Sequence, residues 1–437
     1  MKLSHRTVPA AATLALALGL GACTGTGGTT GDEPNTAGDA TAGDGETVTL
    51  RYLVESLEDA EAEARLRSRL DEFESQNPGI TVELSSLPFD TMQTVLQTQL
   101  RSGDAPDVFN WGSGPSFGGA LAEAGLLYDL ADAYEEFGWE VYDFAQERVT
   151  TDDGMVYGVP GEMETLGIFY NRALFEELGL EEPTDLADLE QIAQIAADAG
   201  YIPFAISDQE GWQGGHQLSM ALSSAVGSDG MEQHIEGEKP WTSPEVVEAI
   251  AVWDRWYEAG YLTPFPTSVG YDSGNALFFS GDAAMLPMGS WLVDGIVANA
   301  DFEAGFFPFP APDGRGIFAA GLGSGPMITA ETRHPEEALQ LVDFLASPEH
   351  GRWMIENIDV IPPFPTDMDG VDVSPLFAEV LADVAEFGAG AGDFGVNIDV
   401  LMEEAFNQAM FDGMQAIYSD QATPEEVAQS LEEASQQ

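Results

Sequence analysis

Residues 48–84 read VTLRYLVESLEDAEAEARLRSRLDEFESQNPGITVEL, and this stretch decides the fold. Residues 48–54 are rich in side chains that favour strands. The segment that follows has apolar side chains at i, i+4 and i+7, the spacing of one helical face: Leu66, Leu70 and Phe73. Pro78-Gly79 breaks that helix, and residues 80–84 alternate again like a strand. The stretch therefore predicts a strand-helix-strand unit.

The alternation continues toward residue 109. A second helical face is formed by three apolar residues: Met92, Leu96 and Leu100. The short apolar run Val108-Phe109 follows as a third strand. Strands that alternate with helices indicate an α/β fold with parallel strands, whose ligands bind at the carboxyl ends of the strands. Asn110 and Trp111 stand at such an end and are candidate ligand contacts.

The second half of the chain repeats this pattern. Three further runs resemble strands: 156–159, 168–170 and 202–206. Four helices are expected from their N-terminal signals: after Thr184, and at Ser243-Pro244, His334-Pro335 and Thr423-Pro424, the last with a capping box. Trp253 shares an apolar stripe with Val246, Ile250 and Tyr257, so we expect it in the core rather than against a ligand.

The N-terminal segment, residues 1–22, has the composition of a secretory signal peptide. A positive start is followed by an apolar run from Val8 to Leu20, which is too short to span a bilayer as a helix. The run ends on Leu20-Gly21-Ala22-Cys23, which holds the only cysteine of the 437 residues. These four residues resemble the lipobox of bacterial lipoproteins, which implies that the thiol of Cys23 takes a diacylglycerol and that the mature chain begins there.

Residues 23–46 are expected to form a flexible tether. Thr24 to Glu46 is built of Gly, Thr, Asp and similar residues, with no large aliphatic side chain to bury. The folded part then starts near Thr47, and its length of about 390 residues suggests two domains. The expected location is outside the cytoplasm, with the protein anchored to the cell membrane by its N-terminal lipid.

Charge is extreme, with 76 acidic against 14 basic residues and a formal net charge of −62. A field of that sign repels phosphate backbones, so nucleic-acid binding is excluded. The acids are spread through the whole chain. Two explanations stay open: a solvated acidic shell suited to a salty exterior, and general acidity that keeps the protein soluble.

Three stretches together resemble bacterial extracellular solute-binding proteins of the maltose-binding type, the substrate-binding lipoproteins of carbohydrate ABC transporters. Residues 168–180, IFYNRALFEELGL, resemble that family's YN-x-x-LF-x-x-x-GL element. Residues 278–285, FFSGDAAM, followed by Gly289-Ser290-Trp291, resemble its F-x-x-G-x-AAM and G-x-W elements. Residues 338–361 are similar to its late helix-loop segment, and the order and spacing match over the chain from Thr47.

The resemblance implies two α/β lobes of the periplasmic-binding-protein type, joined by a hinge that the chain crosses more than once. The first lobe is expected to comprise residues 47–163 and 283–318, and the second residues 164–282 and 319–437. The implied function is capture of a mono- or oligosaccharide in the cleft between the lobes and its delivery to ABC transporter permease subunits. We expect a monomer without cofactor, metal or catalytic residue.

The resemblance also implies ligand-binding residues, each carried over from a matching motif. Trp111, Trp212 and Trp291 match stacking aromatic residues, whose flat faces cover the C–H surface of a sugar ring. Glu164 and Glu210 match cleft carboxylates, which accept hydrogen bonds from sugar hydroxyls. Asn110 and Ser290, next to Trp111 and Trp291, are polar candidates, and Asn397 is a further candidate at a position where the family motif is not matched. The alternative for each tryptophan is burial for packing, and for both glutamates a place among the surface acids.

Two departures from the family pattern put the identity of the sugar in doubt. The Asp-Arg pair of some maltose binders is replaced by Ser113-Gly114-Pro115-Ser116. The late aromatic residue of the second lobe has no match, and the nearest candidates are Phe394 and Asn397. Maltose itself is therefore not implied.

Other classes of function stay as alternatives. Glu164 and Glu210 could serve a secreted glycoside hydrolase, which needs paired carboxylates, and the same scaffold could bind a peptide or another non-sugar solute. The five histidines show no metal-ligand spacing. The glycine-rich residues 321–325 lack the lysine of a phosphate-binding loop.

Overall fold

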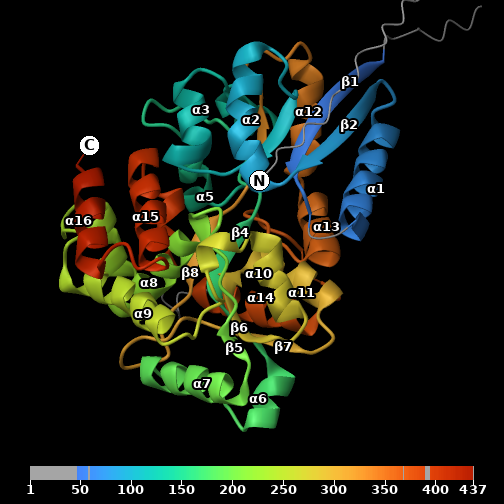
Figure 1. The fold of residues 1–437 in the computed structure, drawn as a ribbon. Helices are drawn as coiled ribbons and strands as arrows, with labels where there is room; N and C mark the ends of the chain where they lie inside the picture. The colour runs from blue at the N-terminus through green and yellow to red at the C-terminus, as the bar shows by residue number, and fades with distance from the viewer. Residues whose placement is uncertain (1–46, 58–59, 368, 389–393, 437) are drawn as a thin grey trace, which may run out of the picture. The chain divides into compact units, whose positions relative to one another are not determined.

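The computed structural model describes residues 47–57, 60–367, 369–388 and 394–436. The expected signal peptide, Cys23 and the tether of residues 23–46 lie outside the described residues. The described chain forms two β-sheets (Figure 1). The four-stranded sheet packs against one apolar core, and the six-stranded sheet packs against two.

The first sheet has four strands in the order β2-β1-β3-β9. They are β1 (Val48–Glu55), β2 (Ile80–Leu87), β3 (Val108–Trp111) and β9 (Gly325–Ile328). β1 runs parallel to β2 and β3, as the sequence predicts, and β9 is antiparallel to β3. The strand-helix-strand unit expected over residues 48–84 is confirmed.

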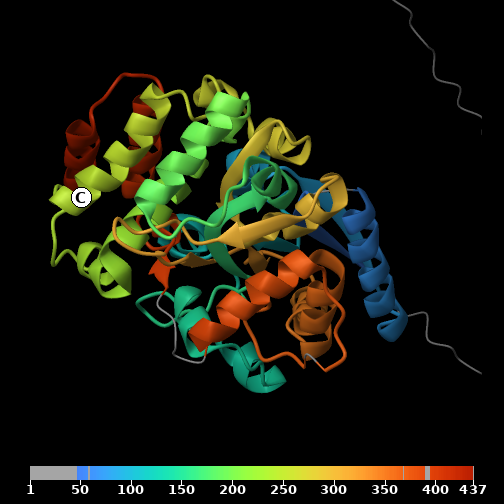
Figure 2. The same cartoon turned by 90° about the horizontal axis from the view of Figure 1, so that it is seen from below.

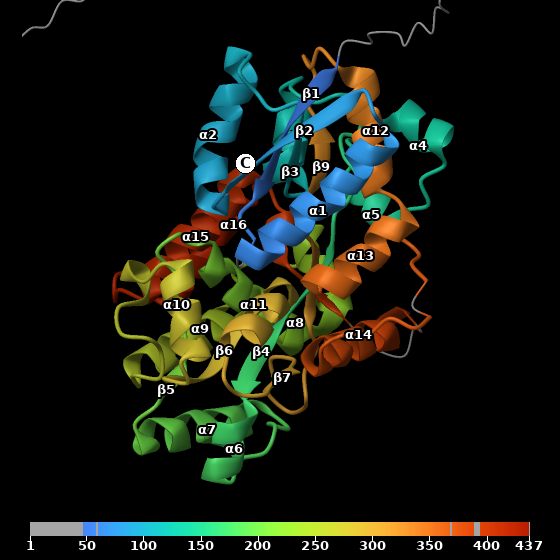
Figure 3. The ribbon, with the colours of Figure 1, turned by 90° about the vertical axis from the view of Figure 1, so that its right-hand side faces the viewer.

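Helices cover this sheet, with α2 on one side and α1, α12 and α13 on the other (Figure 3). They are α1 (Ala60–Gln76), α2 (Phe89–Ser102), α12 (Pro335–Leu345) and α13 (Pro348–Ile358), and the segment between β3 and the second sheet adds a π-helical turn (Pro115–Gly119), α3 (Ala120–Glu123), α4 (Ala131–Phe137) and α5 (Asp143–Arg148). The predicted helical faces point inward, since Leu70, Phe73 and Leu96 are almost wholly buried.

The second sheet has six strands, in the order β10-β8-β4-β6-β5 with β7 also paired to β4. They are β4 (Met163–Asn171), β5 (Ile202–Phe204), β6 (Ala283–Gly289), β7 (Ala304–Phe307), β8 (Ala319–Leu322) and β10 (Gly395–Val396). Every residue of β6 is buried, as expected for a strand covered on both faces.

β4 divides its side chains between two apolar cores, because successive residues of a strand point to opposite faces. Ile168 and Tyr170 join one core, and Phe169 joins the other. The helices α7 and α14 lie on opposite sides of this sheet when it is seen from below (Figure 2). The helices of this half are α6 (Arg172–Leu178), α7 (Leu186–Ala199), α8 (Trp212–Ile235), α9 (Pro244–Glu258), α10 (Tyr271–Phe279), α11 (Val293–Asn299), α14 (Pro375–Gly388), α15 (Glu404–Ile417) and α16 (Pro424–Ala434).

The helix starts follow their sequence signals. Ser243 is the N-cap of α9 with proline in the first turn, and Thr423 forms the predicted capping box with Glu426 at α16. α7 begins after Asp185, whose side chain accepts a hydrogen bond from the backbone N–H of Asp188, and Gly200 ends it with φ 94°. Thr184 stands one residue before the cap.

The sheets differ from the sequence prediction in strand direction. Both are mixed rather than parallel, since β3 runs antiparallel to β9 in the first sheet and β4 runs antiparallel to β6, β7 and β8 in the second. Residues 156–159 form no strand and make only an isolated bridge between Thr150 and Val156. Alternating patterns predict that a strand exists, but the direction of its partner depends on contacts far along the chain.

Strand pairing joins residues from both sides of the expected division into halves at two segments. β6 and β7 lie within residues 283–318, which were expected with the first lobe, yet both pair with β4 in the six-stranded sheet. β9, expected with the second lobe, pairs with β3 in the four-stranded sheet. Apolar strands of this kind carry no local mark of the sheet they join.

The chain passes between the sheets along two segments that contact each other closely. The Val159 N–H donates to the Pro326 carbonyl oxygen at 3.1 Å, and the Gly323 N–H donates to the Glu162 carbonyl oxygen at 3.1 Å. A Cβ at Gly161 would lie 1.9 Å from the Ser324 carbonyl oxygen. Only a residue without a side chain allows this approach.

Within the described ranges, no helix combines the length and hydropathy that a bilayer crossing requires.

Trp253 lies in the core, as predicted. Its side chain is fully buried, its Nε1–H donates to the Gln217 carbonyl oxygen at 3.0 Å, and its ring meets Trp256 edge-on. We expect Trp253→Ala to lower the free energy of unfolding by about 3–5 kcal/mol, because the truncation leaves a cavity. Denaturant titration measures this change. The matched aromatic control is Phe265→Ala, since Phe265 is 74% exposed, and a loss at Trp253 no larger than at Phe265 would contradict the assignment.

The net charge of −62 predicts salt-dependent stability. Mutual repulsion among the negative side chains destabilises the compact state. Sodium chloride screens this repulsion, because the Debye length falls from roughly 30 Å at 0.01 M to 3 Å at 1 M. We expect Tm to rise with sodium chloride over that range, as measured by calorimetry. A Tm that stays constant or falls with salt would argue against net repulsion among the acidic side chains and against an adaptation to salt.

Candidate ligand-binding site

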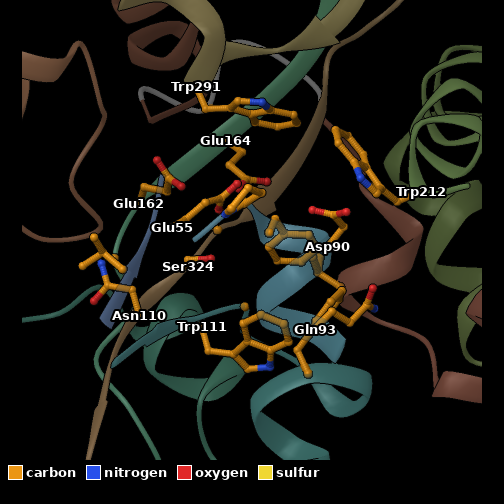
Figure 4. A pocket seen from close by; sticks show the side chains of 18 of the residues that line it. Glu55, Asp90, Gln93, Asn110, Trp111, Glu162, Glu164, Trp212, Trp291 and Ser324 are labelled. Carbon is orange, nitrogen blue, oxygen red and sulfur yellow. The ribbon is translucent and has the colours of Figure 1, made fainter. Parts of the chain in front are cut away.

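A cavity of about 980 Å³ opens between elements of both sheets. Its size is that of a typical small-molecule site. The lining includes residues at strand ends, helix starts and turns, among them Asn110, Trp111, Glu164, Glu210, Trp212, Trp291 and Asn397. Seven of the eight predicted ligand-binding residues therefore line one cavity. Trp111 and Trp291 lie on opposite sides of it, and Trp212 lies on a third (Figure 4).

Trp111 is the last residue of β3 and belongs to a first aromatic cluster. Its ring stacks on Phe89, the first residue of α2, with centroids 5.1 Å apart and an interplanar angle of 20°. Phe117 meets both rings at 6.0 Å. Trp111 is 6% exposed, so most of its surface is buried by packing, and the remainder lines the cavity.

Trp212 and Trp291 belong to a second aromatic cluster together with Tyr271 and His216. Trp212 contacts Tyr271 at 5.4 Å, Trp291 at 6.4 Å and His216 at 5.0 Å between ring centroids. The Trp291 Nε1–H donates to the Tyr271 hydroxyl at 3.1 Å, which fixes the orientation of the indole ring. Both tryptophans are partly exposed, unlike Trp111.

Local backbone geometry presents these rings. Gly211 has φ 90° and precedes Trp212 at the start of α8, a conformation that other residues rarely adopt. Trp291 lies in a 3₁₀ turn (Ser290–Leu292) directly after β6. A Cβ at Gly289 would lie 1.8 Å from the Trp291 ring, so glycine is required for the indole to fold back over the strand end.

Glu162 and Glu164 form the acidic side of the cavity, with Glu55 beside them (Figure 4). Glu162 directly precedes β4 and Glu164 is the second residue of this strand, so the two side chains are two positions apart and point to the same face. Burial raises the pKa of Glu162 to about 7. Burial, with the negative charges of Glu162, Asp399 and Glu55, raises the pKa of Glu164 well above its usual value. A Cβ at Gly323 would meet both carboxylates, which therefore converge on this glycine.

Asn397 and Asp399 reach the cavity from the turn after β10 and form a buried polar network with His216. His216 Nε2 lies 3.0 Å from Asp399 Oδ2 and 3.2 Å from Asn397 Nδ2. Asn397 Oδ1 accepts a hydrogen bond from the Ser219 hydroxyl at 3.3 Å. Asp399 Oδ1 has no hydrogen-bond partner, although the side chain is 3% exposed.

Glu210 lines the cavity and also holds its own loop. Its carboxylate accepts hydrogen bonds from the Tyr271 N–H at 3.2 Å and from Gln213 Nε2 at 3.1 Å. Ser290 is the one predicted site residue that does not line the cavity. It is buried, and its Oγ accepts a hydrogen bond from the Thr165 N–H at 3.1 Å.

Sequence reasoning missed several lining residues: Glu55, Phe89, Glu162, His216, Tyr271 and Asp399. Two of them carried a usable signal. Glu55 ends β1 and obeys the same strand-end rule that singled out Trp111, and Glu162 shares the strand period with Glu164. The others reach the cavity through packing between distant segments. Among the described residues, no three His, Cys, Asp or Glu side chains are placed to hold a metal ion.

Known proteins share this fold. A chitin oligosaccharide binding protein superposes with a TM-score of 0.78 at 22% sequence identity, over 90% of this chain and 99% of that chain. The protein RafE of Streptococcus pneumoniae, in complex with raffinose, superposes with a TM-score of 0.70 at 24% identity, over 89% of this chain and 100% of that chain. These likenesses confirm the predicted α/β fold of the periplasmic-binding-protein type.

Sequence comparison leads to the same group. The multiple sugar-binding protein of Streptococcus mutans is 29% identical over 309 residues, which are 69% of this chain and 71% of that protein. The model of the bacterial extracellular solute-binding proteins matches residues 58–352, more than half of the chain. The family that the sequence resembles is thereby confirmed: the chain belongs to the bacterial extracellular solute-binding proteins.

Proposed function

We propose that the protein binds a carbohydrate and delivers it to the permease of an ABC transporter. The observation that carries the proposal is the cavity itself, where aromatic rings face one another across a space lined by carboxylates and amides. Rings of this kind cover the C–H faces of pyranoses, and the polar groups pair with hydroxyls. The multiple sugar-binding protein and the chitin oligosaccharide binding protein are named for the sugars that they bind, and RafE binds raffinose, which supports the proposal.

In this proposal Trp212 and Trp291 stack on sugar rings, and the exposed edge of Trp111 packs from the opposite side. Glu164 and Asn110, which lie near strand ends, form hydrogen bonds with hydroxyl groups of the sugar. Asn397 and Glu210 act mainly as positioning residues, because their polar atoms already pair with His216, Ser219, Gln213 and Tyr271.

We further propose that two lobes close over the ligand. One contains the four-stranded sheet with α12 and α13, and the other contains the six-stranded sheet. Separate apolar cores for the two sheets support this division. The paired segments around Gly161 and Ser324 would serve as the hinge. A ligand that contacts both lobes stabilises the closed form through its differential affinity for that form.

The proposed attachment is a diacylglycerol on Cys23, which leaves residues 23–46 as a tether to the membrane. The family is extracellular, and an anchored binding protein stays close to its permease. We propose that the protein acts as a monomer and catalyses no reaction on its ligand. Incubation with oligosaccharides followed by product analysis tests the last point.

The tryptophans of the second cluster should govern affinity. Once a screen of mono- and oligosaccharides by thermal shift has found a ligand, we expect Trp212→Ala and Trp291→Ala to weaken binding by about five- to 150-fold. That range corresponds to a stacking loss of roughly 1–3 kcal/mol per ring, by analogy with base–aromatic stacking. Isothermal titration calorimetry measures the dissociation constants.

The matched control is Trp139→Ala, because Trp139 does not line this cavity and its Nε1–H pairs with Asp343. It should keep the affinity of the parent protein. Folded Trp212 and Trp291 variants that bind as tightly as the parent would show that the ligand binds elsewhere.

Membrane attachment should depend on Cys23, since no other cysteine can accept the acyl group. We expect Cys23→Ser to abolish metabolic labelling with a radioactive fatty acid and to release the protein from the membrane fraction. Ser4→Ala, within the signal peptide but away from the lipobox, is the control. Unaltered protein without an acyl group at its N-terminus would refute the anchor.

A further inference from the structure

The charges that line the cavity are of one sign. Carboxylates are contributed by separate elements of both halves, and none of the described lysines or arginines belongs to the lining. Six of the acids are Glu55, Glu162, Glu164, Glu210, Asp294 and Asp399. An anionic ligand such as a uronic acid or a sugar phosphate would find no cation there and only repulsion.

General acidity of the protein does not account for this lining. Acids on the surface are solvated and cost little, but Glu162, Glu164 and Asp399 lie in a partly enclosed cavity. Charge that is removed from water is expensive unless it is paired. The charged groups that act on Glu164 are themselves all carboxylates: Glu162, Asp399 and Glu55.

Elsewhere the few arginines are used to pair acids. Arg65 lies 2.8 Å from Asp294, at the edge of the same cavity, and Arg51 lies 3.2 Å from Asp104. The cavity acids of β4 have no such partner. Asp399 has only His216 at Oδ2, and its buried Oδ1 is left without a hydrogen bond. Asp399 lines the cavity and has one carboxylate oxygen without a hydrogen bond, which favours a ligand that brings a hydrogen-bond donor to this side chain.

The donor is better supplied by an organic cation than by a metal ion. No three His, Cys, Asp or Glu side chains converge for metal coordination in the described part of the chain. The rings of Trp212, Tyr271 and Trp291 line the same space. Their faces attract an ammonium group, which carboxylates attract as well. Hydroxyl groups of a neutral sugar can satisfy hydrogen bonds, and an ammonium group in addition compensates the negative charge of an ionised carboxylate.

We propose that the preferred ligand is an amino sugar, a carbohydrate whose protonated amine binds between Glu162, Glu164 and Asp399 while its rings stack on Trp212 and Trp291. This inference rests on the proposed carbohydrate function and specifies the substrate class. The neighbouring charges agree with it. Burial raises the pKa of Glu162 to about 7, so near neutral pH a fraction of the Glu162 side chains is protonated in the empty cavity, and a bound ammonium group displaces that proton.

The test uses three β-1,4-linked glucose-based series of equal length, from one to four units. They differ only at C2, which carries an amine, an acetamido group or a hydroxyl. Calorimetric titration at pH 6.5, where the amine is protonated, measures each dissociation constant. We expect the amino series to bind at least tenfold more tightly than the other two, which is the range of a hydrogen bond to a buried charge. Added salt should weaken the amino series alone.

Proton linkage gives a second readout. Titrations at pH 7 in two buffers of different ionisation enthalpy should show proton release with the amino series and none with the acetamido series. The groups that face Glu162 and Glu164 in this titration are Glu55 and Asp399, and His216 stands against Asp399.

Variants locate the effect. Glu162→Gln and Glu164→Gln replace a carboxyl by an amide of the same shape, and each should lower the ratio of the acetamido to the amino dissociation constant by roughly tenfold. Glu83→Gln is the control, because it removes one negative charge from an exposed position of β2 outside the cavity. It should leave the preference unchanged.

The outcomes separate the two proposals. Equal or tighter binding of the hydroxyl or acetamido series overturns the amino-sugar inference and leaves the carbohydrate function standing. An unchanged preference in both glutamate variants overturns it as well, because the cation is then bound elsewhere. Binding of spermidine without binding of any saccharide in a broad screen refutes the carbohydrate function itself.

Discussion

The close contact between residues 158–164 and 321–326 is the constraint on which the site depends. These two segments carry the chain between the sheets and are hydrogen-bonded to each other, with glycines where the backbones touch. A Cβ at Gly325 would lie 2.1 Å from the Val159 carbonyl oxygen. Because the segments touch, Glu162 and Glu164 on one of them face Ser324 and Gly323 on the other, and all of them meet at the cavity (Figure 4).

Glycines also make room for the aromatic side chains of the cavity. Gly289 leaves room for the Trp291 ring, and Gly211 turns the chain so that Trp212 opens α8. Hydrogen bonding then orients the rings, since Trp291 donates to Tyr271 and the Tyr271 N–H donates to Glu210. A pre-oriented ring loses little conformational entropy on binding, which favours affinity.

Charge works differently on the surface and in the cavity. Exposed acids are hydrated, and salt screens their repulsion, so a large excess of them is tolerated. Cavity acids cannot be screened in this way, and their pKa values rise instead. The chain has few basic residues, and Arg65 and Arg172 pair with Asp294 and Glu379 rather than with the cavity carboxylates. The structure thus leaves its least solvated acids without an internal cation.

Local patterns allowed much of the fold to be predicted. The β1-α1-β2 unit and the burial of Trp253 depend on periodicity, the start of α9 on its first-turn proline, and the start of α16 on capping-box hydrogen bonds, all of which are encoded in neighbouring residues. Seven of the eight side chains that were predicted from the sequence as ligand-binding line one cavity. Ser290 does not line the cavity, because its side chain points inward and accepts a hydrogen bond from the Thr165 N–H. Motif matching cannot detect this orientation.

Local sequence patterns indicated most of the strands and helices and most helix starts, and the composition showed that the chain is extremely acidic. The strand partners became known from the three-dimensional fold, in which β6 and β7 join β4 and β9 joins β3. It alone also placed Glu55, His216 and Asp399 around Glu164. The physical reason is that sheet partners and cavity neighbours are chosen by packing between residues far apart in the chain, and neither is encoded in the period of any one segment.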